Sequence, residues 1–295
     1  VELPIHKEEA FTGKAFYIGH TDYAKAAGIL GKSEENWIIQ LHEDNVILTG
    51  GVKENDRGIL YAGYHFLEDI VGIRWWSVWE EYVPALTELS LEENFCREGT
   101  PFFEHRKVLG FRHMDHFYYD ARTRGNVVGD DGLEGGVYHP CIKELGGAKP
   151  FGRPHHVHTI DKYFPPEEYF DLHPEWFALY SGVRVPWSHF CLSSESLAEV
   201  LTERLLAYIE EDKALSEKTG AALPDFYDIS FPDQMEGFCQ CDACRKAVES
   251  SGISGLALKF VNKIARVVAE KLVVPEIHLR LLTAISYHQL GDDAS

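Results

Sequence analysis

The sequence predicts an α/β protein in which a small α+β N-terminal domain precedes a (β/α)8 TIM-type barrel that is incomplete in this chain. Strands and helices are expected to alternate after residue 97, which indicates βαβ units around a parallel sheet. The apolar segment Phe226–Phe231 leads directly into carboxylates, as barrel strands do at their active-site ends. About 200 residues follow residue 97, whereas a complete barrel needs about 250, so we expect only about five βα units.

The α+β domain is expected to cover residues 1–97. A hairpin is predicted from two apolar runs joined by a polar turn at residues 42–45. A helix is predicted over residues 57–71, ended by Gly72, with one apolar face made of Ile59, Leu60, Tyr64, Leu67 and Ile70. The expected strands are residues 14–18, 37–41, 46–49, 73–76, 82–84 and 89–91.

The barrel is expected to cover residues 98–295. Ser193 or Ser194 is predicted to cap a helix that runs to about Ile209, and residues 256–272 form a second amphipathic pattern. The expected strands and extended segments are residues 105–111, 156–160, 176–180, 188–192, 227–231 and 277–285.

Composition limits the partners of this chain. The chain has 295 residues, 45% hydrophobic and 25% charged, with 28 basic against 47 acidic residues and a formal charge of −19. This field repels nucleic acid and anionic membranes, and no apolar run is long enough to span a bilayer. No organic cofactor is expected, because neither a dinucleotide-binding glycine motif after a strand nor a P-loop is present. The oligomeric state does not follow from these features.

Asp233, Gln234 and Glu236 are the strongest candidates for a catalytic site. Hydrolysis of a glycosidic bond requires one carboxyl group to protonate the leaving oxygen and a second to attack the sugar or activate water. We expect Asp233 and Glu236 to be catalytic and Gln234 to bind substrate. The alternative is that Asp233 only caps a turn before Gly237, and a second carboxylate can also come from another strand.

The sequence Cys239-x-Cys241-x2-Cys244 forms a compact thiol cluster. A structural zinc ion needs four ligands, so the fourth would come from Cys191 or a histidine. A disulfide with one free thiol, or buried small apolar side chains, are the alternatives. A zinc-dependent hydrolase would need an open coordination position.

Two further segments carry side chains suited to sugar binding. His155, His156 and His158 alternate along a predicted strand end, where they could bind hydroxyl groups, hold a metal or simply be exposed. Arg112 and His113 follow the first predicted barrel strand among aromatic residues. Arginine suits carboxylates and hydroxyls, so we expect Arg112, His113 and His158 to bind substrate.

Two stretches of the sequence resemble known families. Residues 56–76 (DRGILYAGYHFLEDIVGIRWW), followed by Val83-Pro84, resemble the N-terminal domain shared by α-glucuronidases and related glycoside hydrolases. Residues 173–184 (HPEWFALYSGVR), residues 191–193 (CLS), and Asp233 with the thiol cluster resemble a large bacterial family catalogued as domain of unknown function 4838.

The resemblance implies an accessory α+β domain on a glycosidase-type barrel, often in secreted proteins that degrade polysaccharides. It therefore implies a secreted or periplasmic location. Hexosaminidase-like barrels carry an Asp-Glu pair after the fourth strand, whereas this chain has Asp233-Gln234. Only Asp233 carries over, which argues against substrate-assisted hexosaminidase chemistry.

The sequence as a whole predicts a glycoside hydrolase that acts on a polysaccharide or oligosaccharide, including uronic-acid-containing ones, through carboxylate acid/base catalysis. The alternative is a carbohydrate-binding protein that kept the scaffold without catalysis, since a fold does not by itself define an activity. A second carboxylate facing Asp233 across a cleft would distinguish the two.

Overall fold

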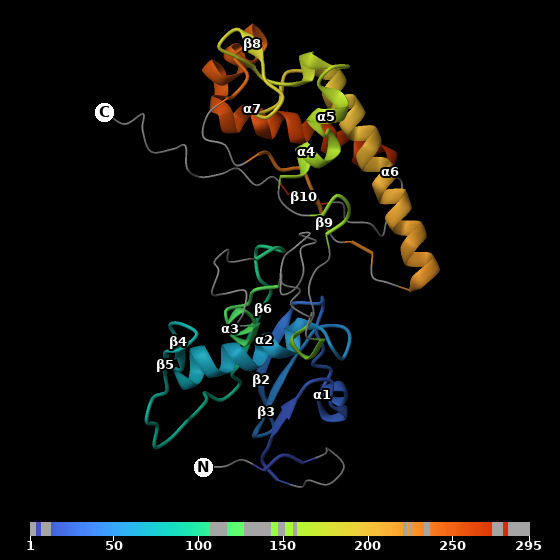
Figure 1. Cartoon of the computed structure of the whole chain (residues 1–295). Helices are drawn as coiled ribbons and strands as arrows, with labels where there is room; N and C mark the ends of the chain where they lie inside the picture. The colour runs from blue at the N-terminus through green and yellow to red at the C-terminus, as the bar shows by residue number, and fades with distance from the viewer. Residues whose placement is uncertain are drawn as a thin grey trace, which may run out of the picture. The chain divides into compact units, whose positions relative to one another are not determined.

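Helices and strands alternate along a mixed α/β chain (Figure 1). The computed structural model describes residues 4–6, 13–106, 117–126, 143–146, 151–155, 158–220, 223–224, 226–232, 237–272 and 280–282. The chain divides into two compact units. The first comprises Val1–Asp130 with Val137–Ala148, and the second comprises Asp131–Gly136 with Lys149–Ser295.

The first unit is built on a four-stranded sheet. The strand order is β1-β3-β2-β6, in which β1 runs parallel to β3 and the other pairs are antiparallel. Its elements are β1 (Phe16–Ile18), α1 (Asp22–Ala26), β2 (Trp37–His42), β3 (Asn45–Gly50), α2 (Arg57–His65), the π-helical turn η2 (Phe66–Val71), β4 (Arg74–Trp75), β5 (Glu81–Tyr82), β6 (Cys96–Gly99), α3 (Phe117–Arg122) and the 3-10 turn η3 (Lys143–Leu145).

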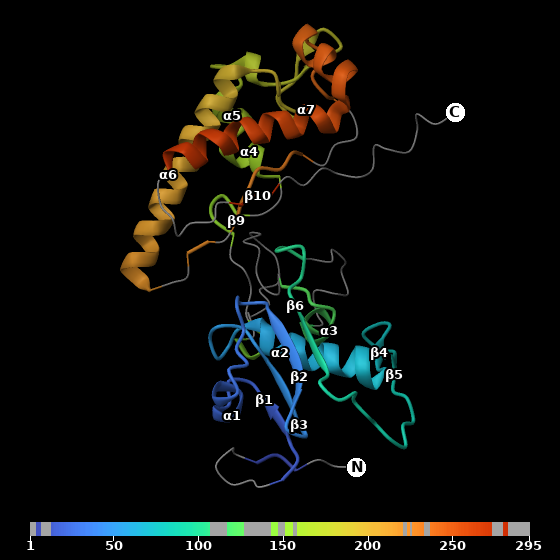
Figure 2. The same ribbon diagram turned by 180° about the vertical axis from the view of Figure 1, so that it is seen from behind.

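The two faces of the sheet bury alternate residues, as the strand period of two requires. Ile38 and Ile47 pack with Ala24 of α1 on one face. On the other face, β2 and β3 contribute apolar residues that pack against α2 and η2, namely Ile39, Leu48, Ala62 and Phe66. Both views show α2 lying across the sheet (Figure 2).

The predicted hairpin is confirmed, because β2 and β3 pair up to His42↔Asn45. Glu43 and Asp44 have φ of 47° and 66°, the left-handed values of a two-residue hairpin turn. The predicted strand at residues 89–91 is wrong, since the last strand of the sheet is β6, which pairs with β2.

The predicted helix over residues 57–71 is confirmed as α2 and η2, and Gly72 ends it at φ 88°. The expected apolar face packs against the sheet in part, through Leu67 and Ile70. Its residues are half-buried, whereas the buried ones are Arg57, Gly58, Tyr61, Ala62 and Phe66. At Gly58 the backbones of helix and sheet approach closely: a Cβ there would lie 2.1 Å from the carbonyl oxygen of Asn36.

Residues beyond 97 are bound into the first unit by a buried carboxylate. Glu35 is 7% exposed and accepts hydrogen bonds from Arg106 Nη2 at 2.9 Å and Asn126 Nδ2 at 3.0 Å. Arg106 Nη2 also donates to Tyr61 Oη at 2.8 Å. These long-range bonds hold Arg106 and Asn126 to the first unit, which thus includes residues past 97.

The second unit combines two long helices with short strands. Its elements are α4 (Thr159–Tyr163), α5 (Pro166–Tyr169), the 3-10 turn η4 (Pro174–Trp176), β7 (Leu179–Tyr180), β8 (Val183–Arg184), α6 (Glu195–Thr219), β9 (Phe226–Asp228), α7 (Asp242–Lys271) and β10 (Arg280–Leu282). The strands β7 and β8 pair antiparallel, whereas β9 and β10 are parallel, and Phe151 forms a parallel bridge to Phe226.

An aromatic core joins these elements. Residues from α4, η4, α6, β9 and α7 form one buried cluster, which includes Ile160, Tyr163, Phe164, Trp176, Phe177, Phe190, Leu201, Leu205, Tyr227, Ile229, Phe260 and Ile264. Ser194 caps α6 and its side chain accepts a hydrogen bond from Leu197 N, which confirms one of the two predicted capping residues. Figure 2 shows α6 and α7 crossing in contact.

One expectation for the second unit is wrong. The segment 156–160 is expected as a strand, but α4 starts at Thr159 after His158, which has φ 53° and cannot continue a strand. The helix expected over 256–272 is confirmed as the part of α7 that follows a kink at Gly252, and α7 also extends back to Asp242, so the thiol segment leads directly into it. Most of the strand expected at 105–111 lies outside the described residues. None of the helices that the structure describes could span a membrane.

Candidate functional site

The candidate site lies at the carboxyl end of β9. This strand is fully buried, and the parallel bridge from Phe151 on one side and β10 on the other run in the same direction. Carboxyl ends of parallel segments meet at one edge of a sheet. Residues 152–161, which follow the bridge, and residues 229–237, which follow β9, therefore start from the same edge.

Backbone and hydroxyl hydrogen bonds fasten the start of α4 to the end of β9. Ile160 N donates to Ser230 O at 3.1 Å, and Ser230 N donates to Thr159 Oγ1 at 2.9 Å. Thr159 Oγ1 in turn donates to Asp228 O at 2.9 Å. These groups are buried, where each satisfied hydrogen bond avoids a desolvation cost of about 1–3 kcal/mol. The chain that leads into residues 233–236 is thus held in one position.

His158 and Asp161 lie at this edge. The His158 ring is exposed, and its Nδ1 lies 3.1 Å from Phe231 O. Because a carbonyl oxygen only accepts, Nδ1 carries the hydrogen and donates the hydrogen bond. In that tautomer the other ring nitrogen accepts hydrogen bonds. Burial raises the pKa of Asp161 to about 6; nearby His158 lowers it and Glu167 raises it. Asp161 is therefore a carboxyl group that can exchange protons near neutral pH.

Sequence reasoning missed Asp161. No motif marks it, because its pKa is raised chiefly by burial on folding, with an opposing effect from His158 and a smaller contribution from Glu167.

The chain that follows residues 233–236 is also held. Gly237 has φ 95°, and its carbonyl oxygen accepts a hydrogen bond from Ser188 Oγ at 3.1 Å. A Cβ on Gly237 would lie 1.9 Å from Ser188 Oγ, so only glycine fits. The ring of Phe238 stacks on His189 at 3.9 Å, and Gln240 N donates to Leu179 O at 2.7 Å.

Four cysteines come together immediately after this segment. The sulfurs of Cys191, Cys239, Cys241 and Cys244 all lie within 4.8 Å of one another. Cys191 Sγ is 3.7 Å from Cys241 Sγ and 3.8 Å from Cys244 Sγ. All four are free thiols, so the disulfide alternative is wrong for this structure: a bond needs about 2.05 Å between sulfurs. Cys191 is the fourth thiol of the cluster, and it is one of the two sources that the sequence predicts for a fourth ligand.

Cys191, Cys239 and Cys244 differ in acidity. Hydrogen bonds from Cys191 and Cys244 lower the pKa of Cys239 below its ordinary value, and the same hydrogen bond raises the pKa of Cys191. Cys244 is subject to opposite effects: its bond with Cys191 lowers its pKa, whereas its bond with Cys239 and burial raise it, to about 11 in balance. Cys239 is therefore the first of these three thiols to ionise.

The structure brings together part of the predicted site. His158 lies at the edge described above, and the four cysteines form one cluster. Asp233, Gln234, Glu236, Arg112, His113 and His156 lie outside the described residues. Their predicted roles stay predictions.

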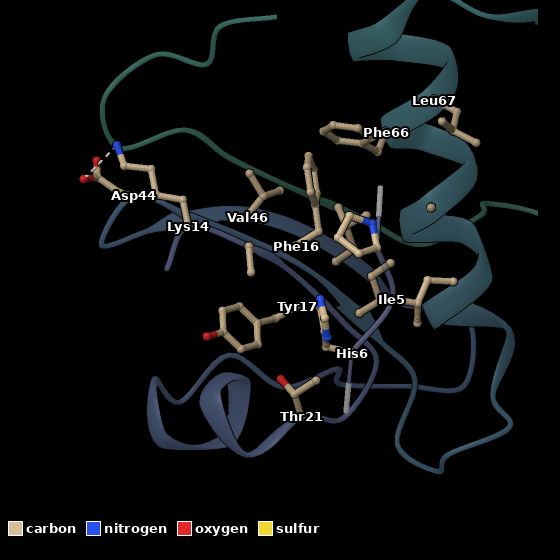
Figure 3. Close-up of a pocket in the computed structure, with 15 residues that line it drawn as sticks. Ile5, His6, Lys14, Phe16, Tyr17, Thr21, Asp44, Val46, Phe66 and Leu67 are labelled. Atoms are coloured by element: carbon tan, nitrogen blue, oxygen red, sulfur yellow. Dashed lines mark ion pairs between the residues drawn. The ribbon is translucent and has the colours of Figure 1, made fainter. Parts of the chain in front are cut away.

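A concavity in the first unit has a different character (Figure 3). Its volume is about 700 Å3, and it lies between β1 and η2, lined by Phe16, Ile18, Phe66 and Leu67. Among the described residues that line it, the carboxylate is Asp44, which forms an ion pair with Lys14 at 3.1 Å. The described lining thus offers one carboxylate rather than the pair that acid/base hydrolysis of a glycoside requires.

The sequence of this chain belongs to a known family. A family model described as Domain of unknown function (DUF4838) matches residues 75–289, and the chain is a member of that family, as its motifs indicated. No curated protein matches the chain. The resemblance of residues 56–76 to α-glucuronidase N-terminal domains stays a prediction.

One solved structure similar to the chain is described as the crystal structure of a beta-N-acetylhexosaminidase. It is 9% identical, with a TM-score of 0.32, over 87% of this chain and 61% of that chain. The chain thus spans less than two thirds of the length of that structure. A likeness this weak does not define a shared fold.

Proposed function

We propose that this protein is a glycoside hydrolase that acts on polysaccharides or oligosaccharides, with uronic-acid-containing chains as the first substrates to test. The observation that carries the proposal is the fixed carboxyl end of β9. Hydrogen bonds from α4 hold the chain before residues 233–236, and Ser188, Phe238 and Gln240 hold the chain after them. Carboxylates presented from rigid flanks are what positioned acid/base catalysis requires.

The proposal extends to a barrel of the TIM type. Phe151, β9 and β10 run parallel, and the helices α6 and α7 separate them along the chain. This order supports consecutive βα units, and catalytic groups of such barrels lie at the carboxyl ends of the strands.

Asp233 is proposed as the general acid or as the carboxylate that stabilises the transition state, with Glu236 as the second candidate. Arg112, His113, His158 and Gln234 are proposed to bind hydroxyl groups or a substrate carboxylate. Asp161 supplies a further carboxyl group at the same edge, with a pKa of about 6. Such a value suits a general acid near neutral pH, which favours an enzyme over a non-catalytic binding protein. Polysaccharides do not cross membranes, so the proposal places the protein outside the cytoplasm, secreted or periplasmic.

The test is an assay of the intact protein, with any residues that flank this sequence, on a panel of aryl glycosides and aryl uronides. Asp233→Asn should lower kcat by on the order of 100-fold or more, because it removes a proton donor or a stabilising charge. Asp171→Asn removes the same charge at an exposed position on the second unit and should keep full activity. Equal turnover by wild type and Asp233→Asn would remove Asp233 from the mechanism. Carbohydrate binding without turnover by the wild type would establish the binding-protein alternative.

A further inference from the structure

We propose that Cys191, Cys239, Cys241 and Cys244 bind one Zn2+ ion in a closed, structural site. A tetrahedral zinc ion with four thiolate bonds of about 2.3 Å needs sulfurs about 3.8 Å apart. The separations of 3.7 and 3.8 Å from Cys191 to Cys241 and Cys244 match this value. All sulfurs lie within 4.8 Å of one another, so an ion can enter with small side-chain movements.

The local backbone has the form of a thiolate site. Cys241 is the N-cap of α7, and its sulfur accepts the backbone N–H of Cys244 at 3.5 Å. Leu179 N donates to Cys239 Sγ at 3.4 Å. Backbone N–H groups aimed at sulfur stabilise thiolates, and the positive end of the α7 dipole adds to this effect.

The surroundings offset the charge of the site. Four thiolates around Zn2+ carry a net charge of −2. The guanidinium of Arg184 lies 3.9 Å from Cys239 Sγ, and Ser193 Oγ lies 3.2 Å from Cys244 Sγ. In metalloproteins, groups that contact the ligand atoms in this way fix the orientation of the ligands and adjust their charge.

The donor set selects the ion and its role. Sulfur ligands in a tetrahedral arrangement favour zinc or iron, whereas magnesium and calcium require oxygen ligands. Three of the four cysteines are buried, among apolar neighbours such as Ala178 and Leu256. Since four protein ligands fill a tetrahedral ion, no coordination position is left for water or substrate. The site is therefore structural, and the zinc-dependent hydrolase considered from the sequence is not what this geometry supports.

The position of the cluster indicates that the ion would link two segments of the second unit. It joins Cys191, which precedes α6, to the segment 239–244, which leads from Gly237 into α7. The apolar cluster around it is small, so packing alone contributes little at this junction. A metal that ties two segments about 50 residues apart supplies folding free energy directly. It also holds the end of the segment 237–240 that follows Asp233 and Glu236.

The first experiment is metal analysis of the chain purified without chelators or added metal. We expect about one zinc per chain, and chelation should lower the midpoint of thermal unfolding by on the order of 10 °C. Cobalt added to the chelated chain should produce the intense charge-transfer absorption of thiolate-bound Co2+. The proposal fails if the folded chain holds no metal and chelation leaves its midpoint unchanged, or if it holds iron in place of zinc.

Substitutions localise the ion. Cys241→Ser should lose most of the bound zinc, whereas Cys96→Ser should retain it, because Cys96 is an exposed thiol of the first unit. Cys241→His keeps a zinc ligand and should retain metal where serine does not, which separates lost coordination from lost folding. Full zinc retention by Cys241→Ser, or equal loss with Cys96→Ser, would overturn the assignment. None of these readouts depends on glycosidase activity, so the outcome is independent of the proposed function.

Discussion

Asp161 is predicted to destabilise the second unit once it ionises, and Asp161→Asn tests this directly. Its pKa is raised from 3.8 to about 6, chiefly by burial. The folded state therefore binds the proton more tightly than the unfolded state. The stability that this group contributes is present below about pH 4 and is lost as the pH rises through about 6.

The magnitude follows from the size of the shift. About two pKa units correspond to about 3 kcal/mol at 1.36 kcal/mol per unit. Because the Asp161 side chain is partly exposed, solvent screens the charge and the expected effect is about 1–2 kcal/mol. Asparagine has nearly the same shape and is neutral at every pH, so Asp161→Asn should be more stable than wild type at pH 7.5 and of similar stability at pH 4.

Urea unfolding at a series of pH values between 4 and 7.5 measures this difference. Asp171→Asn, at an exposed position of the same unit, is the matched control and should differ from wild type by a constant small amount. The reasoning is refuted if the difference between wild type and Asp161→Asn does not change with pH, or if Asp161→Asn is the less stable protein at pH 7.5.

The remaining predictions concern packing around β9 and α6. Gly237→Ala should lower the free energy of unfolding by about 2–3 kcal/mol through strain and a clash, whereas Gly182→Ala, which has φ 84° but no atom near its Cβ, should cost about 1 kcal/mol. Chemical denaturation compares the two, and equal losses would contradict the clash. Asp212→Ala should cost about 2–4 kcal/mol, since this 8%-exposed carboxylate accepts from Arg153 Nε at 2.8 Å. Glu211→Ala removes the exposed partner of Arg153 and should cost less than about 1 kcal/mol; a loss as large as that of Asp212→Ala would be inconsistent with burial as the cause.

Local signals in the sequence led to correct conclusions where nearby residues decide the outcome. The hairpin turn at Glu43-Asp44, the helix end at Gly72 and the cap at Ser194 depend on hydrogen bonds and backbone angles within a few residues. The family followed from short motifs for the same reason, because a motif is read along the chain.

The tertiary structure decided what depends on contacts between distant residues. The sequence left the fourth ligand open between Cys191 and a histidine, and folding brings Cys191 beside Cys241 across about 50 residues. Apolar periodicity did not identify Arg57 and Gly58 as buried residues of α2, because Gly58 is buried by the close approach of the Asn36 backbone rather than by hydrophobicity. The raised pKa of Asp161 also arises only on folding, since burial raises it against the opposing effect of His158.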